Sequence, residues 1–233
     1  MQNGKVIVIE GACDCIGKTT QRRLLEKKFK DSSIEYVAHH FPTRGKSQAE
    51  LVDRYLSGVL GKKDELNPFL VNNFFAIDRA VTWEENLNEE YENGKVILLD
   101  GYTTSSLTYQ SALIKDPVER EKFLNYVPYY EYDILGIKKP DLIIFLTAPY
   151  TTVQEFAKRR STKTKHTKDI HENDQEYMKR VYCNSNHLAE RYEWSIVNYD
   201  DNGRIKSPEE INDEIVKVIE EKLGLTFSKT LKK

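Results

Sequence analysis

The chain has 233 residues, of which 39% are hydrophobic and 31% are charged, and its formal net charge is −2. This length and composition favour one globular domain with a sizeable core, and no apolar run approaches the roughly 20 residues of a membrane-spanning helix. The near-neutral charge argues against DNA or an anionic membrane as a bulk electrostatic partner, although a local basic patch is compatible with it.

The N-terminus and the cysteines favour the cytoplasm. Met1–Lys5 leads straight into an apolar strand, without a signal-peptide core or a small-residue cleavage site. Cys13, Cys15 and Cys183 are too few and too irregularly spaced for a disulfide framework. The Cys13-x-Cys15 pair leaves metal binding as a minor alternative, because structural zinc needs about four ligands. We therefore expect a cytoplasmic protein that binds neither nucleic acid nor membrane.

Strand and helix patterns alternate along the chain. Val6–Ile9 is a short, continuous, β-branched run, which is typical of a strand buried on both faces. Further strands are predicted over 36–38, 96–99, 142–146 and 195–198. Helices are predicted over about 19–30, 47–57, 68–91, 105–114, 117–135, 151–160, 173–192 and 208–223.

The last of these helices has a well-marked start. Ser207 can cap it, Pro208 suits the first helical position, and Glu209 and Glu210 place negative charge near the positive helix end. After this helix, residues 225–233 are predicted to form a C-terminal tail that is frayed from residue 226.

Short apolar strands that alternate with helices predict a parallel five-stranded sheet, covered on both faces in a three-layer α/β/α arrangement. Residues 1–224 would form a single domain, because no linker or internal repeat divides them. Ligands of such sheets bind at the carboxyl ends of the strands. Motifs that directly follow a strand are therefore the candidates for a functional site.

One such motif lies between the first strand and the first helix. The segment from Gly11 to Thr20 is G-A-C-D-C-I-G-K-T-T, which is similar to the Walker A pattern G-x-x-x-x-G-K-[ST]. Backbone N–H groups of such a loop surround the β-phosphate at a helix N-terminus. Lys18 would reach the β- and γ-phosphates of ATP, and the hydroxyl of Thr19 would bind Mg²⁺. The residues expected to bind ATP are Asp14, Cys15, Ile16, Gly17, Lys18, Thr19 and Thr20.

The loop departs from the pattern in its length, because Gly11 and Gly17 enclose five residues instead of four. In the register that fits, Ala12 replaces the first glycine, and a left-handed backbone at Ala12 would cost about 1–2 kcal/mol. The alternative is a loop with one extra residue that bulges.

Several motifs occur in the order in which thymidylate kinases carry them. They are Ile9–Gln21 with its aspartate, Phe41–Arg44 (F-P-x-R), Asn73–Arg79, Asp100–Ser106 (D-R-Y-x-x-S-S/N) and Lys139–Leu142 (K-P-D-L). The sequence therefore resembles the thymidylate kinase family over roughly residues 4–224. The resemblance implies a P-loop kinase fold with a mobile lid, phosphoryl transfer from ATP to dTMP with Mg²⁺, and a homodimer.

The resemblance also implies roles on the acceptor side. Phe75 would stack on the thymine ring, although an isolated phenylalanine is more often part of a core. Arg79, one helical turn later on the same face, would reach the base carbonyl or the 5′-phosphate. Arg44 would lie near the acceptor phosphate, where its planar guanidinium suits phosphate oxygens.

Further roles follow from the same resemblance. Asp14 would accept a hydrogen bond from the 3′-hydroxyl, and Tyr109 would crowd the ribose 2′ position and favour deoxyribose. Ser106 and Gln110 would border the base. Asp100, at the end of the third strand, would act on Mg²⁺ directly or through water and, with Lys18, take part in catalysis.

A basic segment follows the helix predicted over 151–160. Residues 158–168 are rich in lysine and arginine, lack aromatic residues, and occur where this family carries its lid, predicted here over about 158–172. A closing lid excludes water and brings cations to the transferred phosphoryl group. We predict Arg159 and Arg160 as catalytic residues, with Lys163 and Lys165 as alternatives to Arg160. Such a cation is needed because Cys15 stands where some members have a catalytic arginine.

The largest departure from the family is Gly101, which replaces an arginine that holds the acceptor phosphate. Loss of one such contact costs about 1.5–3 kcal/mol, so weakened, shifted or lost activity are open outcomes. Our hypothesis is that Arg44 and Arg79 partly compensate. The alternatives are a kinase for another nucleotide or nucleoside, and a nucleotide-binding relic. Phe41–Arg44 offers no carboxylate base for a nucleoside acceptor, and the sequence has no Asn-Lys-x-Asp motif of a GTPase.

Overall fold

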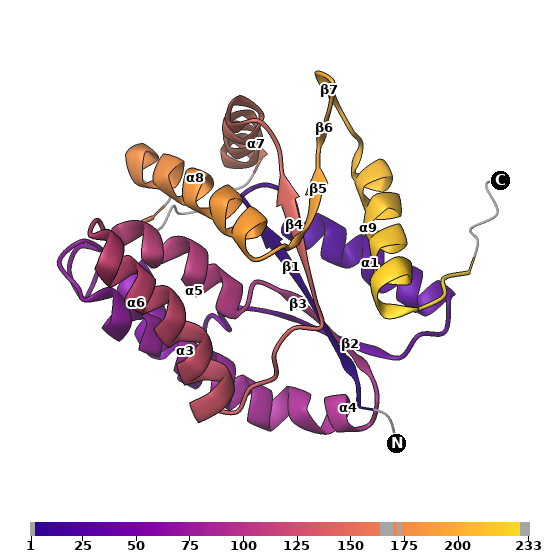
Figure 1. The fold of residues 1–233 in the computed structure, drawn as a ribbon, viewed down its shortest axis with the longest axis horizontal. Helices are drawn as coiled ribbons and strands as arrows, with labels where there is room; N and C mark the ends of the chain where they lie inside the picture. The colour runs from indigo at the N-terminus through magenta and orange to yellow at the C-terminus, as the bar shows by residue number, and fades with distance from the viewer. Residues whose placement is uncertain (1–2, 164–169, 172–173, 229–233) are drawn as a thin grey trace.

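The computed structural model describes residues 3–163, 170–171 and 174–228. Its centre is a parallel five-stranded sheet with the order β2-β3-β1-β4-β5, as predicted (Figure 1). The strands are β1 Lys5–Gly11, β2 Tyr36–His40, β3 Val96–Asp100, β4 Leu142–Thr147 and β5 Ser195–Asn198.

Helices cover both faces of this sheet, with α1 and α9 on one face and α3, α5 and α6 on the other (Figure 1). Alternate residues of β1 explain this arrangement, because Ile7 and Ile9 pack with α1 and α9, whereas Val6 and Val8 pack in the opposite cluster. The helices are α1 Lys18–Asp31, α2 Glu50–Leu56, α3 Pro68–Thr82, α4 Asn88–Glu92, α5 Thr103–Tyr109, α6 Pro117–Pro128, α7 Tyr150–Lys163, α8 Gln175–Arg191 and α9 Pro208–Leu223.

Two long helices differ from their predicted form. A π-helical turn, Trp83–Leu87, separates α3 from α4, and a second one, Tyr129–Ile134, continues α6. The helix predicted over 105–114 begins earlier, and a 3₁₀ turn over Ser111–Leu113 follows its α-helical part, α5. Hydrophobic spacing does not distinguish a π-helical turn from a regular one, so these changes escaped prediction.

A short antiparallel hairpin was also missed. Its strands are β6 Asp200–Asp201 and β7 Arg204–Ile205. Asn202 and Gly203 connect them with φ angles of 52° and 90°. Asn-Gly is the preferred pair for such a two-residue turn, so the signal was present in the sequence.

The C-terminal region is more ordered than predicted as far as residue 228. Ser207 and Glu210 form a reciprocal capping box at the start of α9, which confirms the predicted start. Phe227 is buried and stacks on Phe29 of α1 at 5.5 Å, and the Ser228 amide donates to Ser32. The prediction of fraying from residue 226 is therefore wrong for 226–228, and residues 229–233 lie outside the described residues.

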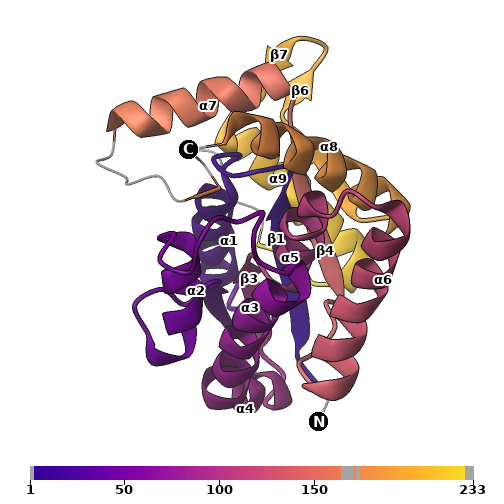
Figure 2. The same ribbon diagram turned by 90° about the vertical axis from the view of Figure 1, so that its left-hand side faces the viewer.

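The segment predicted as a lid begins as helix. α7 extends to Lys163 and lies beyond the carboxyl ends of the strands (Figure 2). Residues 164–169 and 172–173 lie outside the described residues. Within the described part of the chain, no helix is long and apolar enough to cross a membrane.

Candidate active site

The loop between β1 and α1 turns at Cys15 and Gly17, whose φ angles are 70° and 99°. Ala12 does not adopt the left-handed conformation considered above. Its amide instead donates to the Leu146 carbonyl at 2.9 Å, so contact with β4 continues past Gly11 before the chain turns. Gly11 is required by close approach, because an added Cβ would lie 2.3 Å from Cγ2 of Ile16.

Lys18, the first residue of α1, points back toward carboxylates. Its Nζ lies 3.4 Å from Oε1 of Glu10 and 3.9 Å from Oδ1 of Asp14. Burial alone would lower the pKa of Lys18, but Glu10, Asp14 and Asp100 outweigh it and raise the pKa above its ordinary value. Lys18 is therefore a permanent cation at the mouth of the phosphate loop.

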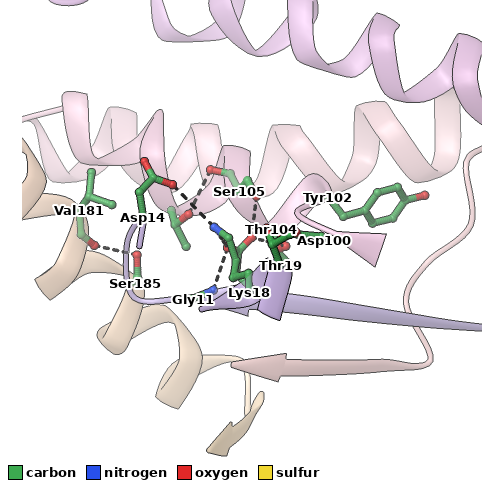
Figure 3. Close-up of polar contacts among 12 residues, drawn as sticks. Gly11, Asp14, Lys18, Thr19, Asp100, Tyr102, Thr104, Ser105, Val181 and Ser185 are labelled. Carbon is green, nitrogen blue, oxygen red and sulfur yellow. Dashed lines mark hydrogen bonds and ion pairs between the residues drawn. The ribbon is translucent and has the colours of Figure 1, made fainter. Parts of the chain in front are cut away.

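Glu10 is a site residue that sequence reasoning missed. Its side chain is fully buried and accepts hydrogen bonds from the Gly11 amide at 2.9 Å, the Thr104 hydroxyl at 2.8 Å and the Ser105 hydroxyl at 2.6 Å. Figure 3 shows Lys18, Thr104 and Ser105 pointing toward this same region. Glu10 thus joins the phosphate loop to α5. The available signal was a charged residue at the end of an otherwise apolar strand.

Asp100, at the end of β3, forms a second polar centre next to the loop. Its Oδ2 accepts a hydrogen bond from the Thr19 hydroxyl at 2.8 Å (Figure 3) and lies 3.4 Å from Nδ1 of His40. Burial raises the pKa of Asp100, but His40, Lys18 and Thr19 outweigh burial and lower the pKa below its ordinary value. Asp100 is therefore ionised at neutral pH. The contribution of His40 was not predicted from the sequence.

The same centre has the donor set for Mg²⁺. Oδ1 of Asp100 is buried and has no hydrogen-bond partner among the described residues. With the Thr19 hydroxyl it supplies hard oxygen ligands, and Mg²⁺ commonly takes one or two carboxylates and keeps several waters. No cluster of three or more His, Cys, Asp or Glu side chains suited to a metal occurs in the described part. The Cys13-x-Cys15 alternative gains no support, since burial raises the pKa of the Cys13 thiol.

Arg79 and Ser106 meet at the contact between α3 and α5. Nη2 of Arg79 donates to the Ser106 hydroxyl at 2.8 Å and to Oε1 of Glu131 at 2.6 Å, and its Nε donates to Oε2 of Glu131 at 2.7 Å. Arg79 and Glu131 are both buried. Sequence reasoning missed Glu131, which lies in the π-helical turn after α6 and carries no motif. The guanidinium is therefore fixed by protein groups, with less freedom to reach a ligand than predicted.

Three other predicted acceptor residues lie on α3, on α5 and directly after α5. Phe75 is half-buried and meets the Tyr55 ring edge-to-face at 6.2 Å. Tyr109 is buried, and burial followed by the negative charge of Asp14 raises its pKa well above the ordinary value. The Tyr109 hydroxyl and Oε1 of Gln110 are buried without hydrogen-bond partners among the described residues. Such groups are costly to bury unless a ligand or water pairs with them.

Arg44 and Arg159 form ion pairs away from the phosphate loop. The Arg44 side chain is 51% exposed and its Nε lies 4.0 Å from Oδ1 of Asp53. Arg159 is exposed on α7 with its Nη2 3.7 Å from Oε2 of Glu155. The side chains of Arg160, Lys163 and Lys165 lie outside the described part.

Comparison with known proteins shows which family the chain belongs to. The thymidylate kinase family model matches residues 9–214, which include the phosphate loop, Asp100 and Arg79. The chain belongs to the thymidylate kinase family. A Thermococcus onnurineus protein named "Probable thymidylate kinase" is 32% identical over 226 residues, covering 93% of this chain and 98% of that protein. The thymidylate kinase of Plasmodium falciparum is 27% identical over 221 residues, covering 94% and 90%.

Structural comparison agrees on the fold. The thymidylate kinase of Candida albicans superposes with a TM-score of 0.69 at 20% identity, covering 98% of this chain and 96% of that one. As a member of the thymidylate kinase family with this fold, the chain is an ATP-dependent nucleoside-monophosphate kinase.

Proposed function

We propose that the protein transfers the γ-phosphate of ATP to dTMP, giving dTDP and ADP. The observation that carries this proposal is the buried carboxylate of Glu10, which contacts Lys18 on one side and Thr104 and Ser105 of α5 on the other. Glu10 thereby joins the phosphate loop and α5, the helix that carries Ser106 and Tyr109, in one hydrogen-bonded network. A donor phosphate and an acceptor nucleotide would therefore meet between them.

On the donor side, the loop residues Asp14 to Thr20 surround the phosphates of ATP, and Lys18 pairs with the β- and γ-phosphates. Thr19 and Asp100 hold Mg²⁺, which when bound neutralises the charge that develops on the phosphates. His40, 3.4 Å from Asp100, helps to keep that carboxylate ionised and oriented. Catalysis then depends on positioning and on cations, because phosphoryl transfer needs little covalent chemistry from the protein.

On the acceptor side, Phe75 stacks on thymine and the fixed guanidinium of Arg79 borders the base or 5′-phosphate. Gln110 offers to the base its Oε1, which has no hydrogen-bond partner in the described part of the chain. Ser106, whose hydroxyl accepts a hydrogen bond from Arg79, also borders the base. The remaining proposed acceptor residues are Asp14 at the 3′-hydroxyl, Tyr109 at the 2′ position, and Arg44 at the phosphate.

The transferred phosphoryl group needs cations besides Lys18, since Cys15 and Gly101 occupy two positions where relatives can carry arginine. We assign this role to the basic stretch that begins with Arg159 and Arg160 on α7. An approach of Arg159 to the loop requires a change in its present contact with Glu155. Reduced activity is consistent with these losses.

We also propose a homodimer. Leu70 and Ile77 lie two helical turns apart on α3 and are 46% and 43% exposed, and Tyr129 beyond α6 is 57% exposed. Large apolar side chains on one helix face favour burial against another chain. Light scattering after size-exclusion chromatography tests this, because Leu70→Glu combined with Ile77→Glu should convert a dimer of two 27.2 kDa chains to a monomer.

The activity is tested by ADP release with ATP and Mg²⁺ against dTMP, dUMP, UMP, CMP, dGMP and no acceptor. We expect release stimulated chiefly by dTMP and abolished in Lys18→Met. Stimulation by another acceptor would keep the kinase assignment but identify that acceptor as the substrate. No stimulation by any acceptor, with ATP still bound, would identify a nucleotide-binding relic.

A further inference from the structure

His171, which the proposed mechanism does not use, lies at the centre of a buried group of aromatic side chains. It is 4% exposed, and its Nε2 lies 2.9 Å from the hydroxyl of Tyr55 in α2. Its ring stacks on Tyr109 of α5 with centroids 5.9 Å apart and planes 20° apart. It also meets Tyr177 of α8 at 5.2 Å in an edge-to-face contact. A single imidazole therefore contacts three helices.

These contacts connect two proposed acceptor residues. Tyr55 meets Phe75 edge-to-face at 6.2 Å, with an interplanar angle of 84°. The rings therefore form a continuous series from Phe75, the proposed thymine platform, through Tyr55 and His171 to Tyr109, the proposed sugar contact. Ring pairs at such distances attract each other beyond the effect of burial, and they favour particular ring orientations.

The ring of Tyr109 is oriented by few direct interactions. Its backbone carbonyl accepts a hydrogen bond from the Tyr177 hydroxyl at 2.8 Å, which fixes the main chain. Its ring belongs to the same buried cluster as Cys13 and Ile16 of the phosphate loop. Its hydroxyl makes no hydrogen bond of ordinary geometry among the described residues, although Asp14 of the phosphate loop is close enough to influence it. The orientation of the ring therefore depends on packing, to which the stacked His171 contributes a flat surface.

His171 is itself anchored by neighbouring main-chain contacts. The Ile170 amide donates to the Leu56 carbonyl of α2 at 3.2 Å, and the Asp174 amide donates to the His171 carbonyl at 3.1 Å. Asp174 in turn lies 2.8 Å from Nζ of Lys63. The imidazole is thus positioned by α2 and by the start of α8, and it can transmit that position to Tyr109.

We infer that His171 is a specificity-determining positioning residue, which holds Tyr109 at the sugar and, through Tyr55, aligns Phe75 with the base. This inference rests on the proposed function. A Tyr109 ring that is free to move would admit a 2′-hydroxyl, so His171 favours dTMP over its ribonucleotide counterpart, ribothymidine 5′-monophosphate. His171 acts on the site through Tyr109 and Tyr55, which lie on the acceptor side, so its effect should be confined to the acceptor.

The test compares kcat and KM for dTMP and ribothymidine 5′-monophosphate in wild type, His171→Ala and His171→Phe. In His171→Ala we expect the dTMP KM to rise and the preference for dTMP to fall, each about tenfold, since small misplacements and pocket changes have effects of this size. The KM for ATP should not change. His171→Phe keeps the stacked ring and should retain most of the preference.

Two controls separate this role from general stability. His187→Ala removes an exposed histidine of α8 and should leave the preference unchanged, and Tyr55→Phe should lower it less than His171→Ala because the ring series persists. The inference is overturned if folded His171→Ala keeps the wild-type preference for dTMP. It is also overturned if folded His171→Phe loses that preference as much as His171→Ala does. A wild-type protein that neither phosphorylates nor binds dTMP in calorimetry would overturn the proposed function and this inference with it.

Discussion

Oε2 of Glu131 lies 2.7 Å from Nε of Arg79, and Oε1 of Glu131 lies 2.6 Å from Nη2 of the same guanidinium. Both side chains are buried, and the Thr103 hydroxyl donates to Oε2 at 2.7 Å. The arginine that sequence reasoning assigned to the nucleotide is therefore also part of the fold. A buried charge pair of this geometry holds α3, α5 and the π-helical turn after α6 in register.

Glu131→Gln should destabilise the protein strongly, because it leaves the guanidinium of Arg79 buried without a counter-charge. Removing one partner of a buried pair costs about 3–5 kcal/mol in the free energy of unfolding. The matched control is Glu121→Gln, which breaks an exposed two-bond pair with Arg191 and should have a much smaller effect, because solvent screens exposed pairs. Urea unfolding measures both, and equal effects would contradict the structural role.

Glu10→Gln should lower kcat about 10–100-fold, because misplaced reacting groups have effects of this size. The amide cannot pair with the charge of Lys18 while it also accepts hydrogen bonds from Thr104 and Ser105. Steady-state kinetics with saturating ATP and dTMP checks the loss of kcat. Glu119→Gln, at an exposed position of α6, serves as control. A folded Glu10→Gln protein with wild-type kcat would show that the network is not needed for transfer.

The sheet and its layers could be predicted because their signals are local. Val6–Ile9 and the later apolar runs identify buried strands, and alternation with helices leaves a parallel sheet as the arrangement that covers both faces. Lys18, Thr19 and Asp100 could be placed together for the same reason, since the first two follow β1 and Asp100 ends β3 at the same edge of the sheet.

The partners of the site residues could not be predicted in the same way. Glu131 meets Arg79 only because a π-helical turn shifts the register after α6, and periodicity does not reveal such a turn. His171 lies next to a basic stretch without periodicity, and its partners Tyr55, Tyr109 and Tyr177 come from three separate helices. Such contacts are set by tertiary packing, which a single sequence does not specify locally.

Gly101→Ala should destabilise the protein more than Gly136→Ala. Both glycines have φ angles near 75°, where an alanine costs about 1–2 kcal/mol. At Gly101 the added Cβ would also lie 3.1 Å from the Phe41 carbonyl oxygen and 3.2 Å from Oγ of Ser105, whereas nothing lies within 4 Å at Gly136. The difference between the two unfolding free energies therefore measures crowding at Gly101.

Gly101→Arg would carry the same backbone and contact costs, so restoring the family arginine should reduce stability even where it lowers the dTMP KM. Thermal unfolding and dTMP kinetics on one preparation separate the two effects. An arginine variant that is as stable as wild type would contradict the crowding seen at Gly101. Unchanged kcat and KM would instead show that the missing arginine is not needed here.

His39 should make the protein less stable as the pH falls from about 6.5 to about 4. Burial, followed by the positive charges of His40 and Arg22, lowers the pKa of His39 from 6.5 to about 4. The unfolded chain therefore binds more protons than the folded chain across this window, and stability rises with pH within it. The contribution of His39 is fully present above pH 6.5 and is lost as the pH falls through 4.

His39→Gln removes this titration while keeping a polar side chain next to Thr43. Urea unfolding at pH 8, 6.5 and 5 should show wild type losing stability relative to His39→Gln as the pH falls, with the smallest change between pH 8 and pH 6.5. Because all other titrating groups are shared, they cancel in the difference between the two proteins. A difference that stays constant from pH 8 to pH 5 would show that His39 titrates alike in the folded and unfolded chains.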